Sequence, residues 1–83
     1  MTEYVVEITL LAEGITKDFQ IPDSMQVGVL AELCGRAFTR LTHGRYQPAQ
    51  PPILYDRASG QLLDPDLVIH QTGVRNGSKL LMY

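Results

Sequence analysis

The sequence predicts a small α+β domain of two layers, in which one helix crosses one face of a sheet. Three observations lead to this fold class: alternating segments within residues 3–21, a helical stripe over residues 27–41, and short apolar segments in the second half of the chain. A period of two indicates strands, and a period of 3.6 indicates a helix. Because the helix connects the second strand to the third, it covers one face of the sheet and leaves the other open.

Residues 3–21 are predicted to form an antiparallel hairpin. Residues 3–11 and 17–21 alternate, and residues 12–16 between them supply a turn that contains a glycine. The side chains expected to face the core are Tyr4, Val6, Ile8, Leu10, Phe19 and Ile21. Pro22 ends the second strand because it has no N–H group to donate to a neighbouring strand.

A helix is predicted from residue 27. The apolar stripe consists of Val27, Leu30, Leu33, Cys34, Ala37, Phe38 and Leu41. Each large side chain that is buried contributes about 1.5–3 kcal/mol, so this stripe is expected to be the largest single contribution to the core. Asp23 and Ser24 are helix-initiating residue types. Gly28 and Gly35 each weaken a helix by about 1 kcal/mol relative to alanine, and we interpret them as sites where the helix packs closely on the sheet.

The second half is predicted to contain a loop over residues 42–52 and three strands. Residues 53–56 form the third strand, Leu62-Leu63 a very short fourth, and the apolar run after Asn76-Gly77 the last. Asn-Gly is a strong turn signal because both residues tolerate positive φ. Asp64 and Asp66, on either side of a proline, are typical of turn and cap positions.

Composition and charge exclude several classes of function. The 83 residues are expected to form a single domain, residues 1–83. The net charge of −2 is spread without blocks, which disfavours a nucleic-acid partner. No apolar run approaches the roughly 20 residues of a membrane-spanning helix, so we expect no direct membrane insertion. The absence of a signal peptide and the single cysteine predict a cytoplasmic protein.

No set of side chains predicts catalysis or a cofactor. Cys34 falls on the apolar stripe of the helix, while His43 and His70 fall in loops, so the cysteine is best interpreted as a small buried core residue. Metal binding needs several clustered ligands, and the two aspartates near residue 65 fall short of that. We therefore predict that the chain is not an enzyme and binds no cofactor and no metal.

Several segments together resemble a known family. They are Val5-Val6-Glu7-Ile8, Pro51-Pro52, Asp56-Arg57 with Gly60-Gln61, and Asn76-Gly77-Ser78-Lys79-Leu80-Leu81. Over essentially its whole length the chain resembles the ubiquitin-like β-grasp proteins, and among them the bacterial EsaB/YukD proteins that accompany type VII (WXG100) secretion systems. This resemblance implies a mixed sheet of about five strands, whose first and last strands are parallel neighbours at the centre. It also implies that Leu80 and Met82 face the helix, whereas Leu81 and Tyr83 face the open side.

The remaining candidate site is the open face of the sheet. The predicted partner-binding patch consists of Val5, Leu11, Leu54, Tyr55, Leu81 and Tyr83, of which either Leu54 or Tyr55 faces out, and its polar rim consists of Arg45, Tyr46 and Arg75. Contiguous exposed apolar patches of a few hundred Å² often mark recognition sites, and tyrosine suits them. The alternatives are that these side chains are scattered, or that the loop over residues 42–52 covers them.

We therefore expect a non-enzymatic ubiquitin-like adaptor that binds a protein partner, in a bacterial type VII secretion system. Two alternatives stay open. One is a modifier or carrier acting with an activating enzyme, which the ending Leu81-Met82-Tyr83 disfavours because it lacks Gly-Gly. The other is the cytosolic domain of a larger membrane component of the secretion machinery. Unprotected edges at the second and fourth strands also leave a homodimer formed by strand addition open.

Overall fold

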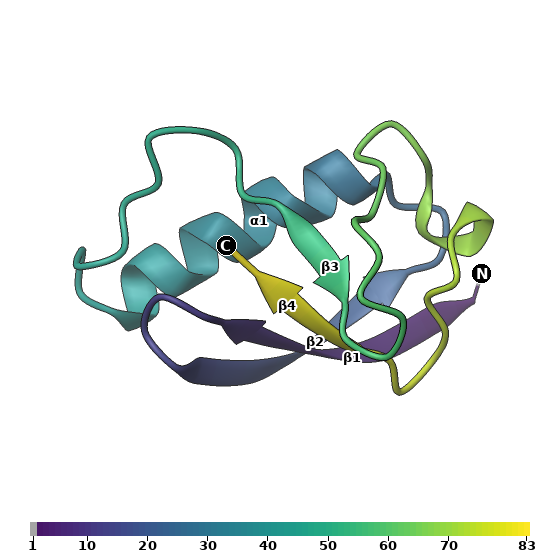
Figure 1. Cartoon of the computed structure of the whole chain (residues 1–83), viewed down its shortest axis with the longest axis horizontal. Coiled ribbons are helices and arrows are strands. Elements are labelled where there is room, and N and C mark those ends of the chain that lie inside the picture. The colour runs from purple at the N-terminus through teal and green to yellow at the C-terminus, as the bar shows by residue number, and fades with distance from the viewer. Residues whose placement is uncertain (1) are drawn as a thin grey trace.

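One helix packs on a four-stranded mixed sheet in the computed structural model, which describes residues 2–83. The elements in chain order are β1 (Glu3–Leu10), β2 (Ile15–Pro22), α1 (Val27–Leu41), β3 (Leu54–Asp56), the 3₁₀ helix η1 (Ile69–Gln71) and β4 (Lys79–Met82). The strand order is β2-β1-β4-β3, with α1 lying across one face (Figure 1). This arrangement confirms the ubiquitin-like β-grasp fold class.

The last strand lies in the middle of the sheet. β4 pairs in parallel with β1 and antiparallel with β3, while β1 pairs antiparallel with all eight residues of β2. The prediction that the first and last strands are parallel neighbours is therefore confirmed. The predicted strand at Leu62-Leu63 is reduced to one isolated bridge between Leu62 and Tyr55, so the sheet has four strands and its edges are β2 and β3. Pro65 follows two residues later, and a proline cannot donate to a longer ladder.

The core lies between α1 and the sheet. Its buried apolar side chains are Val6, Ile8, Leu10, Ile21, Val27, Leu30, Ala31, Cys34, Phe38, Tyr46, Leu54, Leu63, Ile69, Val74, Leu80 and Met82. The alternation predicted for the hairpin is confirmed, with Tyr4 and Phe19 partly buried against this core. The rings of Phe19 and Phe38 meet edge to face at a centroid distance of 5.8 Å, which fixes β2 against α1.

The helix begins at the predicted residue, but its buried face is narrower than predicted. Leu33 and Leu41 are each 44% exposed, so their assignment to the core is wrong. A single helix on a sheet buries only the arc that faces the strands, and both residues lie on its flanks. Leu33 instead lines a groove of about 810 Å³ between α1 and the segment containing Pro48 and Pro51.

The first turn of α1 is capped by backbone from a distant loop. The N–H of Val27 donates to the carbonyl oxygen of Leu67 at 2.8 Å, and the N–H of Gly28 donates to that of Pro65 at 3.0 Å. The residue before the helix, Gln26, makes no side-chain capping hydrogen bond. Asp23 and Ser24, predicted as helix-initiating residues, therefore do not cap α1; the loop satisfies the N–H groups that would otherwise lack partners.

Both glycines of α1 allow loops, and not the sheet, to approach closely. A Cβ at Gly28 would lie 3.2 Å from the Pro65 carbonyl oxygen, and one at Gly35 would lie 3.0 Å from Cγ of Pro52. These distances are tighter than most Cβ contacts. The prediction of close packing was correct, but the partner is the chain that returns over the helix.

The segment after α1 is anchored by Thr42 and Tyr46. Thr42 is buried; its hydroxyl donates to the Phe38 carbonyl oxygen at 2.8 Å and accepts from the N–H of Tyr46 at 3.0 Å. Tyr46 is only 8% exposed and belongs to the core, so its prediction as a rim residue is wrong. The turn around Thr42 directs the ring inward, which a loop assignment from the sequence could not indicate.

Candidate functional site

The face of the sheet opposite α1 carries a group of adjacent apolar side chains at one end. Strand register places Leu81 beside Tyr55, and Tyr55 beside Leu62. The N–H of Leu11 donates to the Met82 carbonyl oxygen, so Leu11 lies at the level of Tyr83. We call the following set the outer cluster: Leu11, Ile53, Tyr55, Leu62, Leu81 and Tyr83.

Two tyrosines form the centre of the outer cluster. The rings of Tyr55 and Tyr83 meet edge to face, with a centroid distance of 4.9 Å and an interplanar angle of 78°. Tyr83 is 56% exposed and Leu62 is 55% exposed. An edge-to-face pair holds both rings in one orientation, so the surface is preformed for contact with a partner.

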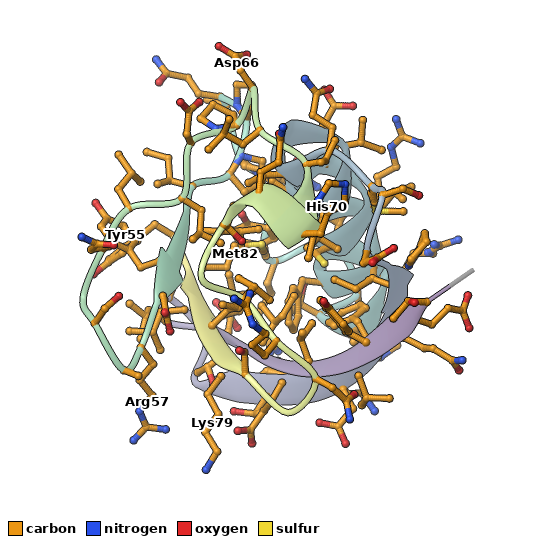
Figure 2. The ribbon with its side chains drawn as sticks, turned by 90° about the vertical axis from the view of Figure 1, so that its right-hand side faces the viewer. Tyr55, Arg57, Asp66, His70, Lys79 and Met82 are labelled. Atoms are coloured by element: carbon orange, nitrogen blue, oxygen red, sulfur yellow. The ribbon has the colours of Figure 1, made fainter. Side chains whose placement is uncertain are left out.

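The structure decides which residue of β3 faces out. Leu54 is 1% exposed and pairs with Met82, so it lies in the core and does not belong to the patch. Tyr55 takes the outward position, and Figure 2 shows it on the side of the sheet away from α1. Because neighbouring strand residues point to opposite faces, placing Leu54 opposite Met82 fixes the orientation of both.

Val5 is exposed but does not join the outer cluster. It is 46% exposed and lies toward the opposite end of β1. Between it and Leu11 on the same face come Glu7 and Thr9. The predicted patch is therefore divided, with Leu11, Tyr55, Leu81 and Tyr83 together and Val5 apart.

The predicted rim residues lie in three different environments. Arg45 donates from Nε to Oε1 of Glu13 at 3.0 Å, in the turn that follows Leu11. Arg75 donates to the carbonyl oxygens of Thr72 and Val74, near the start of β4 and away from the cluster. The Tyr46 hydroxyl comes within 3.5 Å of the Tyr83 carbonyl oxygen, and burial raises the pKa of this phenol. Arg45 therefore borders the outer cluster at the surface, Tyr46 contacts the backbone of Tyr83 from the core, and Arg75 lies apart.

Two members of the outer cluster were missed in the sequence. Ile53 precedes Leu54 and alternates with it, so the inward position of Leu54 places Ile53 outside. Leu62 is outside because it pairs with Tyr55. The local sequence around Leu62 gives no orientation, since a segment of two residues has no measurable period.

A row of four charged residues crosses the same face beside the outer cluster. Asp18 on β2 pairs with Glu7 on β1, and Glu7 pairs with Lys79 on β4. Arg57 directly follows β3 and lies opposite Lys79, because the N–H of Arg57 donates to the Lys79 carbonyl oxygen. We call these four residues the charge row; its residues are acidic on β2 and β1 and basic on β4 and directly after β3. Figure 2 shows Arg57 and Lys79 extending away from α1. Lys79 Nζ lies 3.9 Å from Oε2 of Glu7.

The groups that can carry chemistry are few. Burial raises the pKa of the Cys34 thiol to about 12, so the thiol is protonated and unreactive at neutral pH. Among residues 2–83 there is no group of three or more His, Cys, Asp and Glu side chains placed to hold a metal ion. Within the same residues, no helix is long and apolar enough to cross a membrane.

Comparison of the sequence with protein-family models and with characterised proteins found no match. Solved structures are similar. The EccD5 ubiquitin-like domain from Mycobacterium xenopi has a TM-score of 0.80 and 16% identity, covering 100% of this chain and 94% of that one. A chain of the MycP5-free ESX-5 inner membrane complex has a TM-score of 0.78 and 16% identity, covering 100% of this chain and 21% of that one.

A third similar structure comes from toluene 4-monooxygenase, in its HD complex with the inhibitor 4-bromobenzoate. It has a TM-score of 0.76 and 12% identity, covering 98% of this chain and 96% of that chain. These likenesses establish a ubiquitin-like fold. Proteins of such different kinds share it that the fold by itself does not define an activity.

Proposed function

We propose that this chain is a non-enzymatic, cytosolic ubiquitin-like module that binds a protein component of a bacterial type VII secretion apparatus through the outer cluster. The single observation that carries the proposal is the preformed pair of Tyr55 and Tyr83, exposed beside Leu62 on a sheet face opposite the helix. Rigid aromatic side chains with large apolar area and few rotatable bonds dominate the energetics of protein interfaces.

The assignment to type VII secretion is supported by the structural likenesses. A type VII secretion EccD ubiquitin-like domain and a chain of the ESX-5 inner membrane complex both superpose over all of this chain. The resemblance of the sequence to the EsaB/YukD family points in the same direction. At 16% identity, these structural likenesses support the fold alone, and the assignment of this chain to the type VII secretion apparatus is our inference.

The test compares two exposed residues on the same face. Tagged wild-type chain, Tyr83→Ser and Val5→Ser are expressed in cells that contain a type VII system, and the captured secretion components are quantified. We expect Tyr83→Ser to lower capture by about tenfold, because it removes an aromatic contact. Val5→Ser, a matched change outside the outer cluster, should leave capture unchanged. Equal capture of identified secretion components by both variants would exclude the outer cluster.

A second candidate is a cytosolic domain within a larger membrane component of the same machinery. The observation that favours it is that the matching domain makes up 21% of the aligned ESX-5 chain. The size of the cellular protein on an immunoblot decides between the two. A band near the mass of the 83 residues supports a free adaptor, whereas a much larger band in the membrane fraction supports the second candidate.

A further inference from the structure

We propose that a second copy of the same chain also binds this face and packs sheet against sheet about a two-fold axis parallel to the strands. The inference goes beyond the proposed function, because it gives the same face an occupant in addition to the secretion component. It depends on the order of charges in the charge row. From edge to edge the face reads Asp18, Glu7, Lys79, Arg57, two negative charges followed by two positive ones.

A two-fold axis along the strands makes this row complementary to itself. Rotation about such an axis brings β2 of one copy over β3 of the other, and β1 over β4. Asp18 then faces Arg57 of the second copy, Glu7 faces its Lys79, and the reciprocal pairs form as well. The alternative two-fold axis, perpendicular to the strands, would place Asp18 against Asp18, and that arrangement is repulsive.

The same rotation also stacks the apolar ends. It preserves position along the strands, so the end carrying Leu11 and Tyr83 in one copy meets the same end of the other. Leu11 on β1 then faces Tyr83, which continues β4. Exposed apolar side chains are thus removed from water on the same side of the charge row in both copies. Two sheets packed in this way lie about 10 Å apart, a distance that interdigitating side chains fill.

The charged side chains are accessible for these contacts. Lys79 is 61% exposed and Glu7 is 36% exposed at the side chain, and Asp18 and Arg57 are also exposed. The contact between Lys79 and Glu7 within one copy is long, at 3.9 Å, so both retain capacity for a second partner. The molecule measures 33 × 25 Å along its two longer axes, which limits the interface to the small end of the standard size range. We therefore expect a weak, reversible dimer whose ion pairs make it sensitive to salt.

The test uses charge reversal at the two central positions of the row. Lys79→Glu alone would place a carboxylate opposite Glu7 of the other copy at both symmetric contacts, and Glu7→Lys alone would place an ammonium group opposite Lys79 in the same way. Each variant should dimerise at least about tenfold more weakly than wild type, because like charges are opposed. In an equimolar mixture of the two variants every facing pair is again opposite in charge, so a heterodimer should form. The double variant Glu7→Lys/Lys79→Glu should also recover the dimer.

The measurement is sedimentation velocity of purified chain over a range of concentrations, at low salt and at about 1 M salt. Circular dichroism verifies that each variant is folded, and the mixture controls for loss of structure. Loss of the dimer in each single variant, together with formation of a heterodimer in the mixture, establishes the interface. A wild-type chain that stays monomeric, a dimer that ignores both reversals, or a mixture that fails to recover would each overturn it. Capture of secretion components that depends on Tyr83 would still support the proposed function in those cases.

Discussion

The side-chain oxygen of Asn76 accepts a hydrogen bond from the backbone N–H of Val5 at 2.7 Å, across 71 positions of sequence. The next residue, Gly77, has a φ of 89° and donates its N–H to the Val5 carbonyl oxygen at 2.8 Å. Both backbone groups of Val5 on this side are therefore occupied by the turn that precedes β4. The turn extends the pairing of β1 with β4 beyond the ladder itself.

Replacing Asn76 with alanine should destabilise the protein by about 1 kcal/mol, because the N–H of Val5 loses its acceptor at a site that water reaches. Asn76→Asp retains an oxygen in the same place and should remain within about 0.5 kcal/mol of wild type. Urea unfolding followed by circular dichroism measures both. Equal losses in the two variants would mean that the hydrogen bond contributes little.

Removing the hydroxyl of Thr42 should be more costly. Thr42→Val preserves shape but leaves the N–H of Tyr46 buried without an acceptor, which costs about 1–3 kcal/mol. Thr42→Ser keeps the hydroxyl and should cost less than half as much. Chemical denaturation gives the two free energies of unfolding. A Thr42→Val variant as stable as Thr42→Ser would contradict the role of this hydroxyl in anchoring the segment after α1.

Gly28→Ala should destabilise the chain, although alanine is the better helix former by about 1 kcal/mol. The new methyl group would sit 3.2 Å from the Pro65 carbonyl oxygen, which also accepts the N–H of Gly28, so relief of the contact disturbs the cap. Val29→Ala is the control, since Val29 is exposed on the same turn and should be nearly neutral. Thermal unfolding compares them. A higher midpoint for Gly28→Ala would show that the loop moves away freely.

Cys34 should be inert in the native state and should make stability fall at high pH. Burial raises the pKa of its thiol from 9.0 to about 12, so ionisation favours the unfolded chain between these values. Below about pH 9 the thiol is protonated in both states and does not change the free energy of unfolding. As the pH rises from there toward 12, the free energy of unfolding falls by up to about 1.4 kcal/mol per pH unit. The difference in pH dependence between wild type and Cys34→Ala isolates it. Rapid labelling by a thiol reagent without denaturant would contradict the burial.

Local periodicity in the sequence predicted the elements but not the contacts that decide orientation. Alternation in residues 3–11 and 17–21 identified the inward faces of β1 and β2, because a shift of one residue would turn the apolar side chains of the core face toward solvent. The short segments were different. Whether Leu54 or Tyr55 faces out depends on pairing with Met82, which only the assembled sheet provides.

The candidate site was predicted in part for the same reason. Leu11 was found because it alternates with the core residues of β1, whereas the outward orientation of Leu81 and Tyr83 was predicted from the resemblance to the ubiquitin-like proteins. Tyr46 was misplaced because a buried hydroxyl at Thr42 turns it inward. The cap of α1 was misassigned because its acceptors, Pro65 and Leu67, lie far along the chain and act through backbone, which no residue type reveals.

The central place of β4 has a consequence for the order of assembly during synthesis. Until residue 82 leaves the ribosome, β1 exposes the edge that β4 will occupy, and β3 has no neighbour except through residues near Leu62. The hairpin and the helix can form early, but closing the sheet must wait for the last strand. Nascent chains of this protein therefore present an open strand edge from the emergence of β1 until that of β4, and chaperone contact in that interval should be greatest just before β4 emerges.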